Sequence, residues 1–323
     1  MNVTRILAST FAAMALLAGA PAGGQDFPSK TIEIVVPYPP GGSTDVVARK
    51  LQQKLSELWG KPVMVDNRAG GNGNIGTAYV ARSPADGHRL LMSTSALLTV
   101  NPHVHNNPGF DAFKDFAPVS LVSNGALAVG VNPSLGINTL ADLVAYVKRN
   151  PKKVFYAPPS SGTPQHLVGE LLNQVAGLDM TPVHYKGIAP ALNDVLAGNV
   201  PLVFSTYAAL KPQADAGRIK VLAVAEPKRM DIAPSVPTMA ETFPGFEMTT
   251  WFGIFAPAGT PPAVVNKLSQ AIATIVAQPD VNQLLNSLAL PPMGSGPQEM
   301  GRVLRMDFDR LGRVVRENKI TAD

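Results

Sequence analysis

The fold is decided by one stretch near the N-terminus, Ile32-Glu33-Ile34-Val35-Val36 followed by Pro37-Tyr38-Pro39-Pro40-Gly41-Gly42-Ser43-Thr44-Asp45. The first part is an apolar run typical of a buried strand, and the proline- and glycine-rich part is typical of a loop. Apolar residues then recur on one face of a helix that Gly60 is placed to end, namely Val47, Leu51, Leu55 and Leu58. The stretch therefore predicts a strand, a loop and a helix.

The same order returns in the middle of the chain. Val154–Ala157 is a short apolar run, 158–164 is rich in Pro, Ser and Gly, and 165–176 has a helical apolar pattern that Gly177 ends. Further units are predicted as helices over 189–197, 261–277 and 299–316, and as strands over 200–204 and 219–225. We interpret the arginines of the last helix, with Asp307, as its solvated face. The alternation predicts an α/β protein whose mostly parallel sheet is covered on both faces.

Composition narrows the class of protein. Hydrophobic residues make up 46% and charged residues 15% of 323 residues, which is too apolar for a disordered chain. The chain has no cysteine, so disulfides, thiolate metal sites and a cysteine nucleophile are excluded. Because the net charge is only +4 and no long Lys/Arg run occurs, we expect no nucleic acid partner.

The first 24 residues have the pattern of a secretory signal. Arg5 gives the positive start, Ile6 to Ala20 is apolar, and Ala22-Gly23-Gly24 offers small residues for cleavage. A membrane span needs about 20 predominantly apolar residues, and this stretch is shorter. We therefore expect cleavage after Gly24 and export to a bacterial periplasm.

The two proline- and glycine-rich loops are the candidate binding site. Each follows the carboxyl end of a strand and precedes a helix, which is where open α/β sheets bind ligands. We expect Ser43 or Thr44 to cap the first helix, and Thr163 to cap the other with Pro164 behind it. Helix N-termini favour anions, so the two loops are predicted to hold one carboxylate from both sides. The alternative is that both are ordinary turns.

Two other motifs are weaker indications of function. Gly71-Asn72-Gly73-Asn74-Ile75-Gly76 matches a dinucleotide fingerprint, but 66–70 separate it from the preceding strand, so a packed turn is the better interpretation. His166 follows Ser161, yet no G-x-S-x-G elbow marks a hydrolase. We expect His166 to support its loop or to reach the ligand. No cofactor, metal ion or catalysis is expected.

The chain after residue 24 contains a set of short blocks in a fixed order: Val36 to Gly42 with Asp45 and Ala48-Arg49; Asn67-Arg68; Gly73 to Gly76; Ala85-Asp86-Gly87; Asp115 to Val119; Ser161-Gly162-Thr163; His166-Leu167 and Glu170-Leu171; Tyr185-Lys186-Gly187; Pro190-Ala191; and Ala256 to Pro261. In these blocks, which extend over the whole chain after residue 24, the sequence resembles the tripartite tricarboxylate transporter solute receptors, also called Bug proteins.

The resemblance implies a two-lobed type II periplasmic binding fold with a ligand cleft. Lobe 1 would comprise 25–124 and 227–323, and lobe 2 would comprise 125–226. It also implies capture of a small carboxylate for the membrane permease subunits of a tripartite tricarboxylate-type transporter, and we expect a monomer. The expected ligand-binding residues are Tyr38, Pro39, Gly41, Gly42, Ser43, Ser93, Thr94, Ser95, Ser160, Ser161, Gly162, Thr163, His166, Ser205 and Thr206.

One departure from the family limits the ligand. Phe204-Ser205-Thr206 stands where some relatives carry an acid, and without that acid an ammonium group has no obvious partner. The sequence thus predicts a ligand without an amine, such as a di- or tricarboxylate or an aromatic carboxylate. Three alternatives stay open: a periplasmic ligand sensor for a signalling partner, an exported hydrolase, and a nucleotide-binding enzyme.

Overall fold

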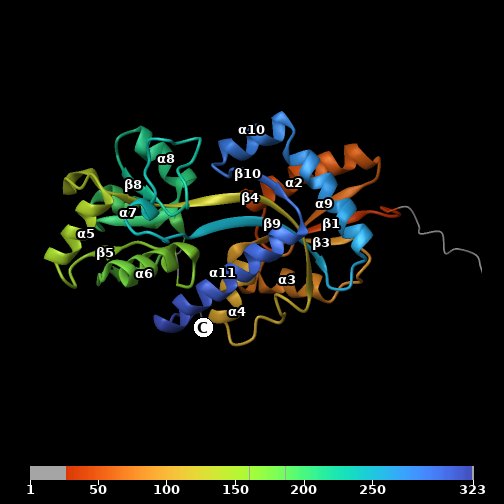
Figure 1. Ribbon diagram of the computed structural model, residues 1–323, viewed down its shortest axis with the longest axis horizontal. Coiled ribbons are helices and arrows are strands. Elements are labelled where there is room, and N and C mark those ends of the chain that lie inside the picture. The colour runs from red at the N-terminus through yellow and green to blue at the C-terminus, as the bar shows by residue number, and fades with distance from the viewer. Residues whose placement is uncertain (1–26, 160, 186, 322–323) are drawn as a thin grey trace, which may run out of the picture.

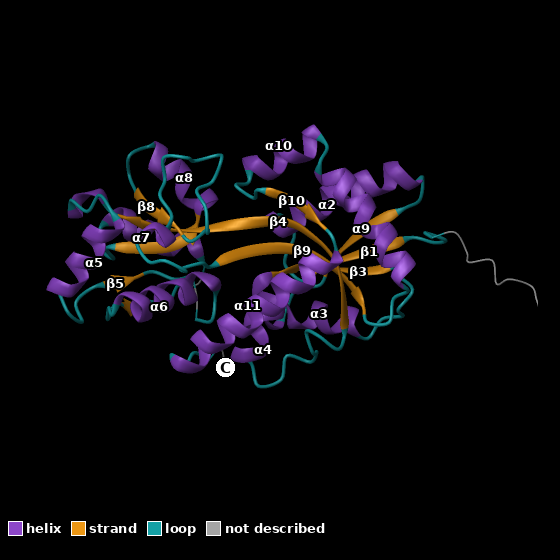
Figure 2. Cartoon of the chain, in the orientation of Figure 1, coloured by secondary structure: helices purple, strands orange, loops and turns teal. Residues whose placement is uncertain are grey.

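The computed structural model describes residues 27–159, 161–185 and 187–321. The predicted signal peptide and Ser160 lie outside these ranges. The strands are β1 (Ile32–Val36), β2 (Val63–Asn67), β3 (Arg89–Thr94), β4 (Phe116–Val131), β5 (Phe155–Tyr156), β6 (Thr181–Pro182), β7 (Leu202–Thr206), β8 (Lys220–Val224), β9 (Thr249–Pro257) and β10 (Pro292–Ser295). The helices (Figure 2) are α2 (Ser43–Trp59), α3 (Asn74–Ala81), α4 (Asn101–Val104), α5 (Leu140–Arg149), α6 (Pro164–Ala176), α7 (Ile188–Ala197), α8 (Tyr207–Asp215), α9 (Pro262–Val276), α10 (Pro279–Ser287) and α11 (Pro297–Glu317).

The predicted strand, loop and helix at the N-terminus are present. β1 has the predicted bounds, and α2 ends at Gly60, whose φ of 60° is the left-handed conformation that favours glycine. The second unit is also present as β5 and α6, with Gly177 in the same conformation at the helix end. Local periodicity and a terminal glycine were sufficient to place both units.

The sheet is mixed rather than mostly parallel. Its order is β2-β1-β3-β9-β4-β7-β5-β6, and β8 and β10 also pair with β4. β1 pairs in parallel with β2 and β3, and β5 with β6 and β7, as βαβ units require. The expectation fails at β4 and β9, which are antiparallel to each other. These two strands cross the molecule in opposite directions, so their pairing is antiparallel.

β4 and β9 run from one half of the molecule into the other (Figure 1). The first part of β4 pairs with β9 and β10, and the part after Ala126 pairs with β7 and β8. One core cluster gathers side chains of β1 and β3 with those of α2 and α9, and another gathers side chains of β7 and α6. The chain therefore forms two lobes joined by crossing strands, the arrangement that a cleft needs.

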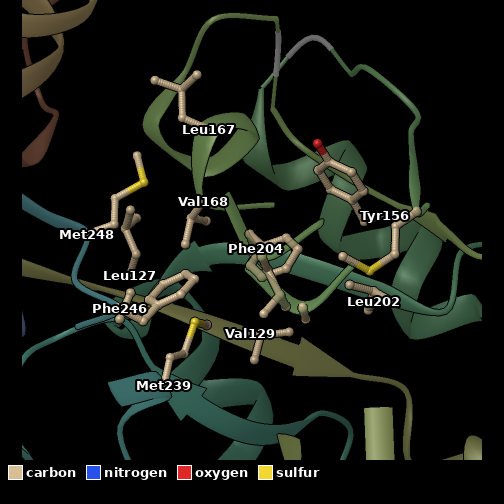
Figure 3. Close-up of a cluster of buried hydrophobic side chains, with 14 of the residues drawn as sticks. Leu127, Val129, Tyr156, Leu167, Val168, Leu202, Phe204, Met239, Phe246 and Met248 are labelled. Atoms are coloured by element: carbon tan, nitrogen blue, oxygen red, sulfur yellow. The ribbon is translucent and has the colours of Figure 1, made fainter. Parts of the chain in front are cut away.

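The segment from 227 to 248 packs on lobe 2. Met239, Phe246 and Met248 belong to the same core cluster as Tyr156 and Phe204 (Figure 3). The chain then pairs Thr249 with Ala126 as it enters β9. We therefore propose the second lobe boundary at 249 in place of 227, and use lobe 1 for 27–124 with 249–310 and lobe 2 for 125–248.

Helix α11 bridges the two lobes. Met300 and Leu304 pack with Trp251 and Phe255 of β9 in lobe 1. Two to three turns after Leu304, the side chains of Leu311, Val314 and Val315 join the lobe 2 cluster that contains Leu167. The C-terminal helix is thus a third connection between the lobes, in addition to the two crossing strands.

Polar side chains of α11 form a cluster with Trp251 of β9. Asp307 is only 3% exposed; it accepts a hydrogen bond from Trp251 Nε1 at 2.8 Å and pairs with Arg310, which also donates to the Glu247 carbonyl. The expectation that Arg310 and Asp307 belong to a solvated face is therefore wrong. Nearby, burial and the charge of Glu247 raise the pKa of Glu226 to about 8.

Within the described part of the chain, no helix combines the length and hydropathy needed to cross a bilayer.

Candidate functional site

The first loop is held in place by Asp45. Its Oδ2 accepts hydrogen bonds from the Gly41 amide and from Arg49 Nε, both at 2.9 Å, and its Oδ1 accepts one from Asn67 at 2.9 Å. Burial alone would raise the pKa of Asp45, but these bonds outweigh it and hold the pKa below its ordinary value. Asp45 is therefore a carboxylate at neutral pH that shapes the loop.

Helix α2 begins without a side-chain cap. Gly42 is the N-cap residue, so the expectation that Ser43 or Thr44 caps the helix is wrong. The helix begins earlier than expected. Gly42 has an extended backbone and is the N-cap residue, so Ser43 is already the first helical residue. The first amides of a helix have no partner within it. Since the Gly41 amide is bound to Asp45, the amides that follow Gly42 are the ones placed to bind an anion.

The second loop is capped as the sequence predicted. Thr163 is the N-cap residue of α6 and accepts a hydrogen bond from the His166 amide at 3.4 Å, with Pro164 at the first helical position. The Gly162 amide donates to Nδ1 of His166 at 3.2 Å. Burial, and then the neighbouring His184, lower the pKa of His166 to about 4. His166 is thus a neutral acceptor that supports its loop.

Four further predicted residues, on β3 and β7, form two groups. Ser93 and Ser205 are buried within β3 and β7. Thr94 and Thr206 stand at strand ends: Thr94 Oγ1 lies 2.8 Å from the Tyr38 hydroxyl, and Thr206 caps α8 by accepting from the Ala209 amide at 3.4 Å. Burial raises the pKa of Tyr38 to about 12, so its phenol is neutral.

A cavity of about 200 Å³ lies between the lobes. Of the predicted residues, four line it: Ser43, Thr94, Ser95 and Thr206. The others do not line it, and the described ones are Tyr38, Pro39, Gly41, Gly42, Ser93, Ser161, Gly162, Thr163, His166 and Ser205. Sequence reasoning missed nine lining residues: Ala96, Pro164, Gln165, Ala208, Thr250, Trp251, Phe252, Leu288 and Leu290. Most of these are apolar, and an apolar residue in an α/β pattern looks like ordinary core.

Three helices begin at this cavity. Ser43 opens α2 in lobe 1, Pro164 and Gln165 open α6 in lobe 2, and Thr206 and Ala208 belong to the start of α8. Each N-terminus carries partial positive charge and unpaired amides. Among the residues that the structure describes, the lining has no Asp, Glu, Lys or Arg side chain. An anion here would be held by amides and hydroxyl groups contributed by both lobes.

A larger and more open groove, of about 860 Å³, lies along α3 within lobe 1. The glycines of the fingerprint-like motif lie beside it, and two of them pack closely. A Cβ on Gly73 would approach Leu97 to 2.3 Å, and one on Gly76 would approach the Arg68 carbonyl to 2.6 Å. These glycines serve close packing, and the groove is built from one lobe only.

Together, the crossing strands, the two lobes and the shared cavity define a two-lobed solute-binding protein of the type II fold. Residues 47–320 match the model of the tripartite tricarboxylate transporter family receptors. The chain belongs to this family, whose members are periplasmic binding proteins rather than enzymes.

Individual relatives span nearly the whole chain. Protein BugT of Bordetella pertussis is 36% identical over 321 residues, 98% of each chain. The structure of Rpa4515 from R. palustris with adipate is 35% identical, covers 92% of this chain and 99% of its own, and has a TM-score of 0.79. MatC from Rhodopseudomonas palustris with bound malate is 28% identical, covers 90% of this chain and 100% of its own, and has a TM-score of 0.74.

Proposed function

We propose that the protein captures a small carboxylate without an amine in the periplasm and passes it to the membrane subunits of a tripartite tricarboxylate-type transporter. The convergence of the α2, α6 and α8 N-termini on one cavity carries this proposal. Each charge-assisted hydrogen bond contributes about 1.5–3 kcal/mol, so a few of them supply the ~8 kcal/mol of micromolar binding. The carboxylates bound by Rpa4515 and MatC support the same ligand class.

Closure around the ligand follows from the way the site is divided. Ser43, Thr94 and Ser95 come from lobe 1, whereas Gln165 and Thr206 come from lobe 2. A carboxylate that bonds to both sets binds the closed arrangement more tightly than the open one, so it shifts the equilibrium toward closure. The closed surface is then the one that the transporter subunits recognise.

The absence of an acid among the described lining residues supports a ligand without an ammonium group. A buried ammonium without a partner costs several kcal/mol of binding free energy. Aspartate should therefore bind far more weakly than succinate, which has the same two carboxylates and no amine.

The alternatives are weaker on specific grounds. The Ser161 hydroxyl donates to the Thr321 carbonyl at 3.0 Å, and His166 Nδ1 accepts from Gly162, so these two side chains do not form a nucleophile and base pair. A sensor would bind the same ligand and differ in its partner. Co-purification with transporter subunits, as opposed to a signalling receptor, separates those two roles.

A thermal-shift screen tests the proposed function. The probes are benzoate, succinate, adipate and citrate, with aspartate and glutamate as the amine-bearing counterparts. A ligand at 100 times its dissociation constant stabilises the folded protein by about 2.7 kcal/mol, which raises the melting temperature measurably. We expect at least one amine-free acid to do so. No shift with any of the acids, or a larger shift with aspartate than with succinate, would contradict the proposal.

A further inference from the structure

The lining of the inter-lobe cavity combines hydroxyl-bearing residues with a larger set of apolar residues. Ser43, Thr94 and Ser95 supply hydroxyl groups, and Ser43 is also the first residue of α2. Ala208 of lobe 2 and Phe252, Leu288 and Leu290 of lobe 1 are apolar. Leu288 and Leu290 follow α10, and both pack against the main lobe 1 cluster. A ligand in this cavity therefore places much of its body against hydrocarbon.

Two threonines of the lining already have partners in the fold. Thr250 Oγ1 donates its only proton to the Gly125 carbonyl at 2.9 Å. Thr206 Oγ1 accepts from the Ala209 amide. Phe252 pairs with Ser123 of β4 and with Thr94 of β3, so the strand backbone on both sides of it belongs to the sheet ladder. A ligand hydroxyl that lies against Phe252, Leu288 or Leu290 would meet no side-chain partner, because these three side chains carry no hydrogen-bonding group.

The cavity also limits ligand size. Pockets for drug-sized molecules hold roughly 300–1,000 Å³, whereas this one holds about 200 Å³. A compact acid with a short hydrocarbon chain or a single ring fits this space.

We propose that the cavity selects carboxylates with an unsubstituted hydrocarbon body over hydroxy acids, with Phe252, Leu288 and Leu290 as the residues that determine this specificity. The inference rests on the proposed carboxylate-binding function and names the ligand class within it. A hydroxyl buried without a partner weakens binding by about 5- to 150-fold, which corresponds to about 1–3 kcal/mol.

Isothermal titration calorimetry with matched acids tests this selectivity. The pairs are butanoate with 4-hydroxybutanoate, and 3-phenylpropanoate with 3-(4-hydroxyphenyl)propanoate, each differing by one hydroxyl group remote from the carboxylate. In any pair that binds, we expect the acid without the hydroxyl to bind 5- to 150-fold more tightly. Equal or tighter binding of the hydroxy acid overturns this inference alone. If none of the four acids binds and the thermal-shift screen is also negative, the proposed function falls, and the inference falls with it.

Two variants assign the selectivity to the apolar side chains of the lining. Leu288→Gln places a hydrogen-bonding amide in the wall, and Ala208→Ser adds a hydroxyl from lobe 2 with little change in volume. Each is expected to reduce the preference for the hydrocarbon acid at least about fivefold. The matched controls are Leu58→Gln on α2, where the side chain is 51% exposed, and Ala216→Ser at the exposed end of α8. Unchanged selectivity in both cavity variants, with folding verified by circular dichroism, overturns the assignment.

Discussion

The Ser43→Trp variant is expected to lose carboxylate binding by at least about 100-fold while keeping its fold. Ser43 is the first residue of α2 and lines the cavity, and it is exposed, so a larger side chain displaces no core residue. The indole fills space in a cavity of only about 200 Å³. Losing two charge-assisted contacts of about 1.5 kcal/mol each already amounts to roughly 100-fold in affinity. Calorimetric titration with an acid from the thermal-shift screen measures the loss.

The control for this variant is Ser134→Trp. Ser134 is exposed on lobe 2 and does not line the cavity, so its replacement tests the cost of a surface tryptophan alone. We expect its affinity to equal that of the unchanged protein. Unchanged affinity in Ser43→Trp, with a normal melting temperature, would show that the ligand does not occupy the inter-lobe cavity.

The second large effect is expected from Arg310→Met, which should lower the free energy of unfolding by about 3–5 kcal/mol. Arg310 is the charge partner of Asp307, whose carboxylate is buried against Trp251. Burial already raises the pKa of Asp307 above its ordinary value although Arg310 opposes the shift. Without Arg310, the carboxyl group must either stay charged without a partner or take up a proton. Urea denaturation at neutral pH measures the loss.

Two controls locate this effect in the charge pair. Arg313→Met is the same substitution on an exposed position one turn along α11, and we expect it to change stability by less than about 0.5 kcal/mol. The double variant Asp307→Asn with Arg310→Met removes both charges and keeps an acceptor for Trp251, so it should recover most of the stability. A loss in Arg313→Met as large as that in Arg310→Met would contradict the account.

The sequence was most informative where structure depends on neighbouring residues. The apolar run of β1, the helical pattern of α2 and the glycine that ends it are local signals, and they placed the first unit within two residues at each end. The cap at Thr163 was also predictable, because a hydroxyl residue followed by proline has one common role at a helix start.

The apolar side chains that line the site could not be found in this way. Leu288 and Leu290 lie far along the chain from Ser43, and only the tertiary fold brings them to the same cavity. Nothing in an apolar residue after a helix distinguishes a ligand wall from core. Asp307 and Arg310 were misplaced for a related reason, since their burial depends on Trp251 in a distant strand.

The predicted loops illustrate a competition for hydrogen bonds. The sequence shows that Gly41 has an amide near the ligand site, but not that Asp45 takes that amide. Similarly, the pair of Ser161 and His166 invites a catalytic interpretation until their partners, Thr321 and Gly162, are known. Each polar group has several possible partners, and the fold decides among them.

The most direct test of the central claim is a crystal structure of the protein with an acid that the thermal-shift screen has identified. The account predicts one carboxylate in the inter-lobe cavity, within hydrogen-bond distance of the Ser43 or Thr44 amide in lobe 1 and of the Gln165 or Ala208 amide in lobe 2. A carboxylate bound to one lobe only, or in the groove along α3, would contradict it.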